Sequence, residues 1–116
     1  MKYLINCEGI VAIIEMPKDK PSAYWGEVQD SFIRACGYDP TVAWLDMIQL
    51  YPDQVIDGVS YDWGLAGPDG ASFRLHKLPG VTDEQIDRAK AKLRRDKDVV
   101  RMSVLRVKQL IPFTLP

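Results

Sequence analysis

The chain has little of the side-chain chemistry that catalysis and metal binding use. Its 116 residues include one histidine, His76, and two cysteines, Cys7 and Cys36. Three scattered residues are too few for a four-ligand structural zinc site. The glycine-rich stretch 57–72 lacks the Gly-Lys-Ser/Thr ending of a phosphate-binding loop, and no calcium-loop spacing occurs. We therefore expect no metal and no cofactor.

Any mechanism that needs a base near neutral pH has one obvious candidate, His76. On a predicted strand His76 has the opposite parity to Phe73 and Leu75, so it should face away from the side on which they pack. No sequence signature brings the sulfur of Cys7 or Cys36 next to it. We interpret His76 as a surface imidazole and the cysteines as buried structural thiols, and we predict that the chain is not an enzyme.

Long apolar runs are also missing. No stretch approaches the ~18–20 apolar residues of a membrane span, and the start, MKYLINCEG, lacks the length and cleavage site of a signal peptide. Two cysteines without CxxC spacing suit a reducing compartment, so we expect a cytoplasmic protein that does not contact membranes. Length and average composition predict one domain over residues 1–109, followed by an extended apolar tail at 110–116.

The first half of the chain shows one strand-rich segment and two helical ones. Residues 2–16 are rich in Ile and Val but too long for one strand of a small domain. Glu8-Gly9 either turns a hairpin there or marks a bulge. A helix is predicted over residues 22–36, with Ser22 as its N-cap. A second is predicted from Asp39 to about Tyr51.

The second half shows clearer signals. Residues 59–66 and 71–78 alternate between apolar and polar side chains, and Gly67-Pro68-Asp69-Gly70 predicts a hairpin turn between them. Thr82 and Gln85 form a capping box that starts a helix. A final strand is predicted over residues 98–107. The resulting order favours an α+β fold of the ferredoxin-like βαββαβ plan with an extra helix, in which an antiparallel sheet of four or five strands carries helices on one face.

Charge is unevenly distributed along the chain. Residues 1–73 have a formal net charge of −7 and residues 74–116 one of +6. Six aspartates and no Lys or Arg lie between positions 39 and 69, whereas the predicted helix after Thr82 carries a basic flank. Such asymmetry indicates a charged partner unless folding interleaves the two halves.

These features favour a non-enzymatic module that occupies the surface of a partner protein, as inhibitors, immunity proteins, adaptors and phage or mobile-element accessory proteins do. A charged surface of the partner would contact either a set of aspartates together with Trp63, or the basic flank of the helix. The candidate residues are Asp46, Asp53, Asp57, Asp62, Trp63, Arg88, Lys92 and Arg95. A homodimer is left open. The alternative is an RNA- or single-stranded-DNA-binding module that uses Tyr3, Phe73 and the basic helix, which the acidic segment disfavours.

Overall fold

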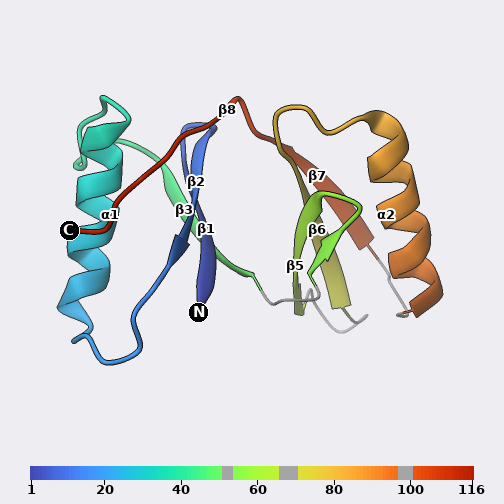
Figure 1. The fold of residues 1–116 in the computed structure, drawn as a ribbon, viewed down its shortest axis with the longest axis horizontal. Coiled ribbons are helices and arrows are strands. Elements are labelled where there is room, and N and C mark those ends of the chain that lie inside the picture. The colour runs from blue at the N-terminus through green and yellow to red at the C-terminus, as the bar shows by residue number, and fades with distance from the viewer. Residues whose placement is uncertain (51–53, 66–70, 97–100) are drawn as a thin grey trace. The chain divides into compact units, whose positions relative to one another are not determined.

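A computed structural model describes residues 1–50, 54–65, 71–96 and 101–116 of the chain. Within these ranges eight strands and two helices are present, and the strands assemble into two four-stranded sheets (Figure 1). The chain divides into two compact units: unit 1 comprises residues 1–49 and 108–116, and unit 2 comprises residues 50–107. The expectation of a single domain over residues 1–109 stays a prediction.

Unit 1 begins with an antiparallel hairpin of β1 (Lys2–Cys7) and β2 (Ile10–Glu15). Glu8 and Gly9 have φ angles of 53° and 92°, as a two-residue type I′ turn requires. The Asn6 side-chain oxygen accepts a hydrogen bond from the Gly9 N–H at 2.9 Å. Of the two alternatives for Glu8-Gly9, the hairpin turn is therefore correct and the bulge is not.

Helix α1 (Ala23–Ala35) lies within the range predicted for it. Gly37 follows the helix with a φ of 85°, and the N–H groups of Gly37 and Tyr38 donate to the carbonyls of Arg34 and Ile33 at 2.9 and 3.1 Å. This pair of bonds is a Schellman motif. Ser22 stands at the N-cap position, as predicted, but its side chain makes no capping hydrogen bond. The face of α1 that packs on the sheet buries Tyr24, Val28, Phe32 and Ile33.

The second predicted helix, from Asp39 to about Tyr51, is wrong: none of residues 39–50 is helical, and Leu45–Leu50 form strand β3. Asp39 organises only a turn: its carboxylate accepts hydrogen bonds from the Thr41 N–H and hydroxyl at 2.9 and 2.8 Å. β3 then pairs beside β1 at the edge of the sheet, whose order is β3-β1-β2-β8. Backbone pairing with that edge outweighs the weak helix preference of the segment, since strand formation depends mainly on neighbouring strands.

The C-terminal segment returns to unit 1. β8 (Gln109–Leu110) pairs parallel with β2, and the Ile111 N–H donates to the Val11 carbonyl at 2.8 Å. Beyond it, residues 111–116 form what we call the strap, in which Ile111, Phe113 and Leu115 pack against the core of unit 1. Phe113 meets Phe32 edge to face, with ring centroids 5.1 Å apart. The predicted apolar tail thus docks on its own unit.

Unit 2 is built on β4 (Val55–Ile56), β5 (Val59–Leu65), β6 (Ala71–Lys77) and β7 (Arg101–Arg106), which lie in that order across the sheet. β5 and β6 are antiparallel, with Tyr61 opposite Leu75, which confirms the predicted hairpin. The turn predicted at residues 67–70 lies outside the described residues. So do residues 98–100 of the predicted final strand, of which β7 is the described part.

Helix α2 (Asp83–Asp96) connects β6 to β7, which run parallel, so it is the crossover of a βαβ unit. The predicted capping box is confirmed: the Thr82 hydroxyl accepts from the Gln85 N–H at 3.2 Å, and the Gln85 side-chain oxygen accepts from the Thr82 N–H at 2.8 Å. The core of unit 2 lies between α2 and one face of the sheet and consists of Val59, Tyr61, Phe73, Leu75, Ile86, Ala89 and Leu93. Neither described helix is long and apolar enough to cross a membrane.

The ferredoxin-like βαββαβ plan is therefore wrong. It requires a single antiparallel sheet with helices on one face, whereas the described strands form two mixed sheets and each helix packs on a different one. Two local events cause the difference: the Glu8-Gly9 turn adds a strand to the first sheet, and residues 45–50 join that sheet rather than forming a helix. The parallel addition of β8 then completes the first sheet.

Replacing Phe113 tests the strap. We expect Phe113→Ala to lower the unfolding free energy by about 1–3 kcal/mol, because it removes a half-buried ring from the contact with Phe32. Thr114→Ala, at the exposed neighbouring position, should change it by less than about 0.5 kcal/mol. Urea denaturation of both variants measures the difference, and equal effects would mean that the strap is not part of the core.

Candidate functional site

An open groove of about 490 Å³ lies between α2 and the turn that follows β4. We call it the basic groove; its described lining residues are Ile56, Asp57, Arg88, Ala91, Lys92 and Arg95. Three of these six side chains are cationic and one is a carboxylate. Ile56 and Ala91 supply the apolar part of the surface.

The turn at one wall of the groove is locked to the start of α2. Asp57 and Gly58 have φ angles of 54° and 81°, which again fits a type I′ turn, here between β4 and β5. The Gln85 side-chain amide donates to the Asp57 carbonyl at 2.9 Å. Because Gln85 also belongs to the capping box, one side chain connects the beginning of the helix to the turn.

The cationic wall follows from helical spacing. Arg88, Lys92 and Arg95 are four and three residues apart and so project from one side of α2. All three are exposed, whereas Ala89 and Leu93 on the adjoining face are buried in the core. The burial of the core face therefore directs these charges to water.

Arg88 and Asp57 form an ion pair within the groove, in which the guanidinium Nε donates to the carboxylate. This hydrogen bond raises the pKa of Arg88, so the guanidinium stays charged at any pH at which the protein is handled. Both side chains are substantially exposed, and exposed ion pairs contribute little to stability. The carboxylate offsets the charge of Arg88, and Lys92 and Arg95 are the other two cations among the described lining residues.

A second hollow, of about 320 Å³, lies on the other flank of α2 and has a more balanced charge. Its lining includes Lys77 and Asp83, which form an ion pair at 2.8 Å. The hydrogen bond from Lys77 lowers the pKa of the Asp83 carboxyl. Lys90, Arg106 and Asp87 are its other charged lining residues, so the formal net charge of the described lining is +1. The basic groove is the stronger candidate for binding an anionic group.

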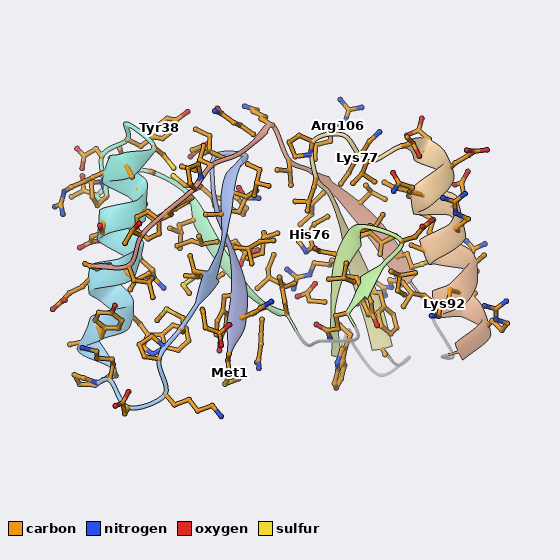
Figure 2. All side chains as sticks on the ribbon, viewed as in Figure 1. Met1, Tyr38, His76, Lys77, Lys92 and Arg106 are labelled. Atoms are coloured by element: carbon orange, nitrogen blue, oxygen red, sulfur yellow. The ribbon has the colours of Figure 1, made fainter. Side chains whose placement is uncertain are left out.

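His76 lies on the sheet face opposite to α2 (Figure 2), as its parity relative to Phe73 and Leu75 predicted. The interpretation as a surface imidazole is wrong, because His76 is wholly buried. Its Nε2 lies 3.6 Å from Asp62 Oδ1, and within the described chain neither ring nitrogen nor that oxygen has a hydrogen-bond partner. Burying such groups unpaired costs about 1–3 kcal/mol each.

The predicted site residues do not form one surface. Asp57, Arg88, Lys92 and Arg95 come together in the basic groove, so acidic and basic candidates meet there. Asp46 is half-buried on β3 of the first sheet, and Asp62 faces away from α2 on β5. Trp63 on β5 is 56% exposed. Asp53 lies outside the described residues.

The aromatic pair named for nucleic-acid stacking is not displayed on an open sheet face. Phe73 is buried in the core under α2. Tyr3 belongs to the other sheet, where it is half-buried and meets Trp25 edge to face with centroids 5.0 Å apart. Folding also interleaves the charges of the two halves: unit 2 contains ten Lys/Arg and nine Asp/Glu, a formal net charge of +1.

The sequence did not reveal the apolar residues of the groove, nor the hydrogen bond from Gln85 to the turn at Asp57. The Asp57-Gly58 dipeptide flanked by Val55, Ile56 and Val59 is a strong hairpin signal and would have located the turn. No local pattern indicates that Gln85 reaches that turn. Comparison of the chain with protein-family models, curated proteins and solved structures finds no match, so the site is interpreted from its own chemistry.

Two substitutions at Asp57 test separately how its charge and its backbone conformation contribute to stability. Asp57→Asn should change the unfolding free energy by less than about 1 kcal/mol, because it removes only an exposed ion pair and Asn tolerates positive φ. Asp57→Ala should cost about 1 kcal/mol more, since its Cβ is strained at this φ. Urea denaturation checks both; equal stabilities would show that the turn does not hold residue 57 at positive φ.

A substitution at His76 tests whether its imidazole is unpaired. We expect His76→Leu to raise the unfolding free energy by about 1 kcal/mol, because it replaces buried, unpartnered nitrogens with apolar atoms. Calorimetry of the wild type and the variant at the same pH measures the difference in unfolding free energy. A clear loss of stability would instead show that the imidazole is satisfied by a bond.

Proposed function

We propose that this protein is a non-enzymatic interaction module whose basic groove binds an acidic surface of a partner protein. The observation that carries the proposal is the exposed row of Arg88, Lys92 and Arg95 along an apolar strip, with Asp57 as the one carboxylate among the described lining residues. A partner carboxylate can compete with Asp57 for Arg88 while others approach Lys92 and Arg95. Binding would occupy the partner's surface, as inhibitors, immunity proteins, adaptors and accessory proteins do.

Several features favour a protein over a nucleic acid as the partner. Ile56 and Ala91 give the groove an apolar strip that suits side chains rather than phosphates. No aromatic residue stands among its described lining residues to stack on a base. A unit with a net charge of +1 would also attract a polyanion weakly. RNA or single-stranded DNA remains the alternative ligand. The two free cysteines support the separate proposal that the protein is cytoplasmic.

The test is a titration followed by NMR. The probe is an amphipathic peptide of Glu and Leu, added to isotope-labelled protein at low and high salt. We expect the amide resonances of residues 88–95 to shift and the affinity to fall as salt rises, because the contacts are exposed charge pairs. The double variant Arg88→Glu, Lys92→Glu should bind at least about tenfold more weakly, since about 1.4 kcal/mol corresponds to that factor.

A matched control carries the same change in net charge elsewhere. Lys18 and Arg34 are exposed residues of unit 1, and Lys18→Glu, Arg34→Glu should leave the affinity within about twofold of wild type. Equal losses in the two double variants would indicate attraction by net charge alone and contradict a groove. Tighter binding of an oligothymidylate than of the peptide, mapped to the same residues, would establish the alternative.

A further inference from the structure

Strand β7 lies at one edge of the sheet of unit 2. β6 pairs with it on one side, and among the described strands none pairs with it on the other. Alternate N–H and C=O groups along Arg101–Arg106 therefore point away from the sheet without a partner strand in the described chain. An edge of this kind can accept one more strand from another chain.

The second hollow, of about 320 Å³, lies between this edge strand and α2. Val104 and Arg106 line it from β7, and Ile86 and Lys90 line it from α2. Val104 is on the face that packs under α2, because it pairs with Leu75 of the core, yet it is 38% exposed. The helix thus leaves the outer strand partly uncovered. A strand added to β7 would project every second side chain toward the hollow.

The charges around the hollow favour a segment that carries a carboxylate. Lys77 is already paired with Asp83. Arg106, which pairs with Lys77 in the strand register (Figure 2), is exposed, and Lys90 is half-buried. Neither Arg106 nor Lys90 forms an ion pair within the part of the chain that the structure describes. Both cations can therefore accept an acidic side chain from outside.

A second copy of β7 fits this edge less well than an acidic strand does. When two β7 strands run antiparallel with all six residues paired, Arg101 lies opposite Arg106 at both ends. Like charges placed directly opposite each other destabilise a strand pair. The same two arginines attract a strand with carboxylates.

We propose that the free edge of β7 binds an extended segment of a partner protein, with alternating acidic and apolar side chains, as a further strand of the sheet. Antiparallel addition is the slightly more stable arrangement. It puts a glutamate opposite Arg106 and, two residues later, an apolar side chain opposite Val104. The next apolar side chain then lies opposite Met102, which packs against the core of unit 2. The pattern that fits is Glu-x-Val-x-Val.

This site is separate from the basic groove, because the two lie on different flanks of α2 and share no described lining residue. Binding here depends mainly on backbone hydrogen bonds, and the side chains select the segment. The inference therefore goes beyond the proposed function and can fail or succeed independently of it.

The experiment titrates the isotope-labelled full chain with the end-blocked peptide Ser-Thr-Glu-Thr-Val-Thr-Val-Thr-Ser and follows it by NMR. We expect the amide resonances of residues 101–106 to shift. Hydrogen exchange at alternate amides of this range should slow at least about tenfold, because the added strand accepts their hydrogen bonds. A peptide that binds without shifts in residues 101–106 would rule out the edge as the site.

Two methylated peptides test the backbone pairing with the protein unchanged. One is N-methylated at Glu and both Val, and the other at the Thr that follows each of these. Only alternate N–H groups of an added strand face β7. One peptide should therefore bind at least about tenfold more weakly than the parent and the other within about threefold. Equal affinities of the two methylated peptides would contradict strand addition.

Arg106→Gln tests the charge selection, and Arg101→Gln is its matched control. Arg101 lies on the same strand but on the face away from α2, since its neighbour Met102 packs under the helix. We expect Arg106→Gln to weaken binding of the parent peptide about tenfold and Arg101→Gln by less than about twofold. A peptide with Gln in place of Glu should abolish this difference. Equal losses in the two variants would show that net charge alone attracts the peptide.

Two further measurements distinguish other occupants and other sites. Arg88→Glu, Lys92→Glu should keep the affinity for this peptide within about threefold at about 0.15 M salt, where distant charges are screened. A larger loss would assign the peptide to the basic groove. Light scattering of the free protein should give the mass of one chain. A dimer with β7 amides protected from exchange would show that a second copy occupies the edge and would overturn the proposal.

Discussion

The burial of Ile86, Ala89 and Leu93 against the sheet of unit 2 is the constraint on which the candidate site depends. Each fully buried side chain of this kind contributes about 1.5–3 kcal/mol, Ala less, whereas an exposed ion pair contributes about 0–1 kcal/mol. The core therefore decides how α2 is rotated about its axis, and the charges take the positions that remain. Arg88, Lys92 and Arg95 face water because the adjoining face of the helix is buried in the core.

Asp57 connects this helix to the neighbouring hairpin in two ways. Its carbonyl accepts the Gln85 amide, and its carboxylate pairs with Arg88. The positive φ of the turn brings both groups to the helix from one residue. The same carboxylate reduces the positive charge of the groove. Under the proposed function, a partner would have to offer more than one acidic group to compete with it, and the groove would then select a surface with several carboxylates over isolated anions.

Local chemistry made much of the fold predictable. The Thr82-Gln85 capping box, the β5-β6 alternation and the glycine that ends α1 all involve residues close in sequence, and all three are observed. The helix predicted from Asp39 failed because the edge of β1 decides the structure of residues 45–50. The parallel pairing of β8 with β2 joins opposite ends of the chain, and no local signal reports it.

The candidate site was predictable to a similar extent. Helical spacing placed Arg88, Lys92 and Arg95 on one flank, but the approach of Asp57 to Arg88 depends on how α2 packs on the sheet. Asp46 and Asp62 looked alike in sequence and occupy different sheets. The burial of His76 likewise arises from tertiary packing, which periodicity does not encode.

The most direct test of the account follows the Arg88 side chain itself. In the free protein its Nε–H donates to Asp57, and under the proposed function a partner carboxylate accepts this hydrogen bond in place of Asp57. The Nε–H resonance of Arg88, recorded while the acidic peptide is added, should move in step with binding, and that of Arg34 in unit 1 should stay in place. Binding of the peptide with an unchanged Arg88 resonance would contradict the assignment of the groove as the binding site.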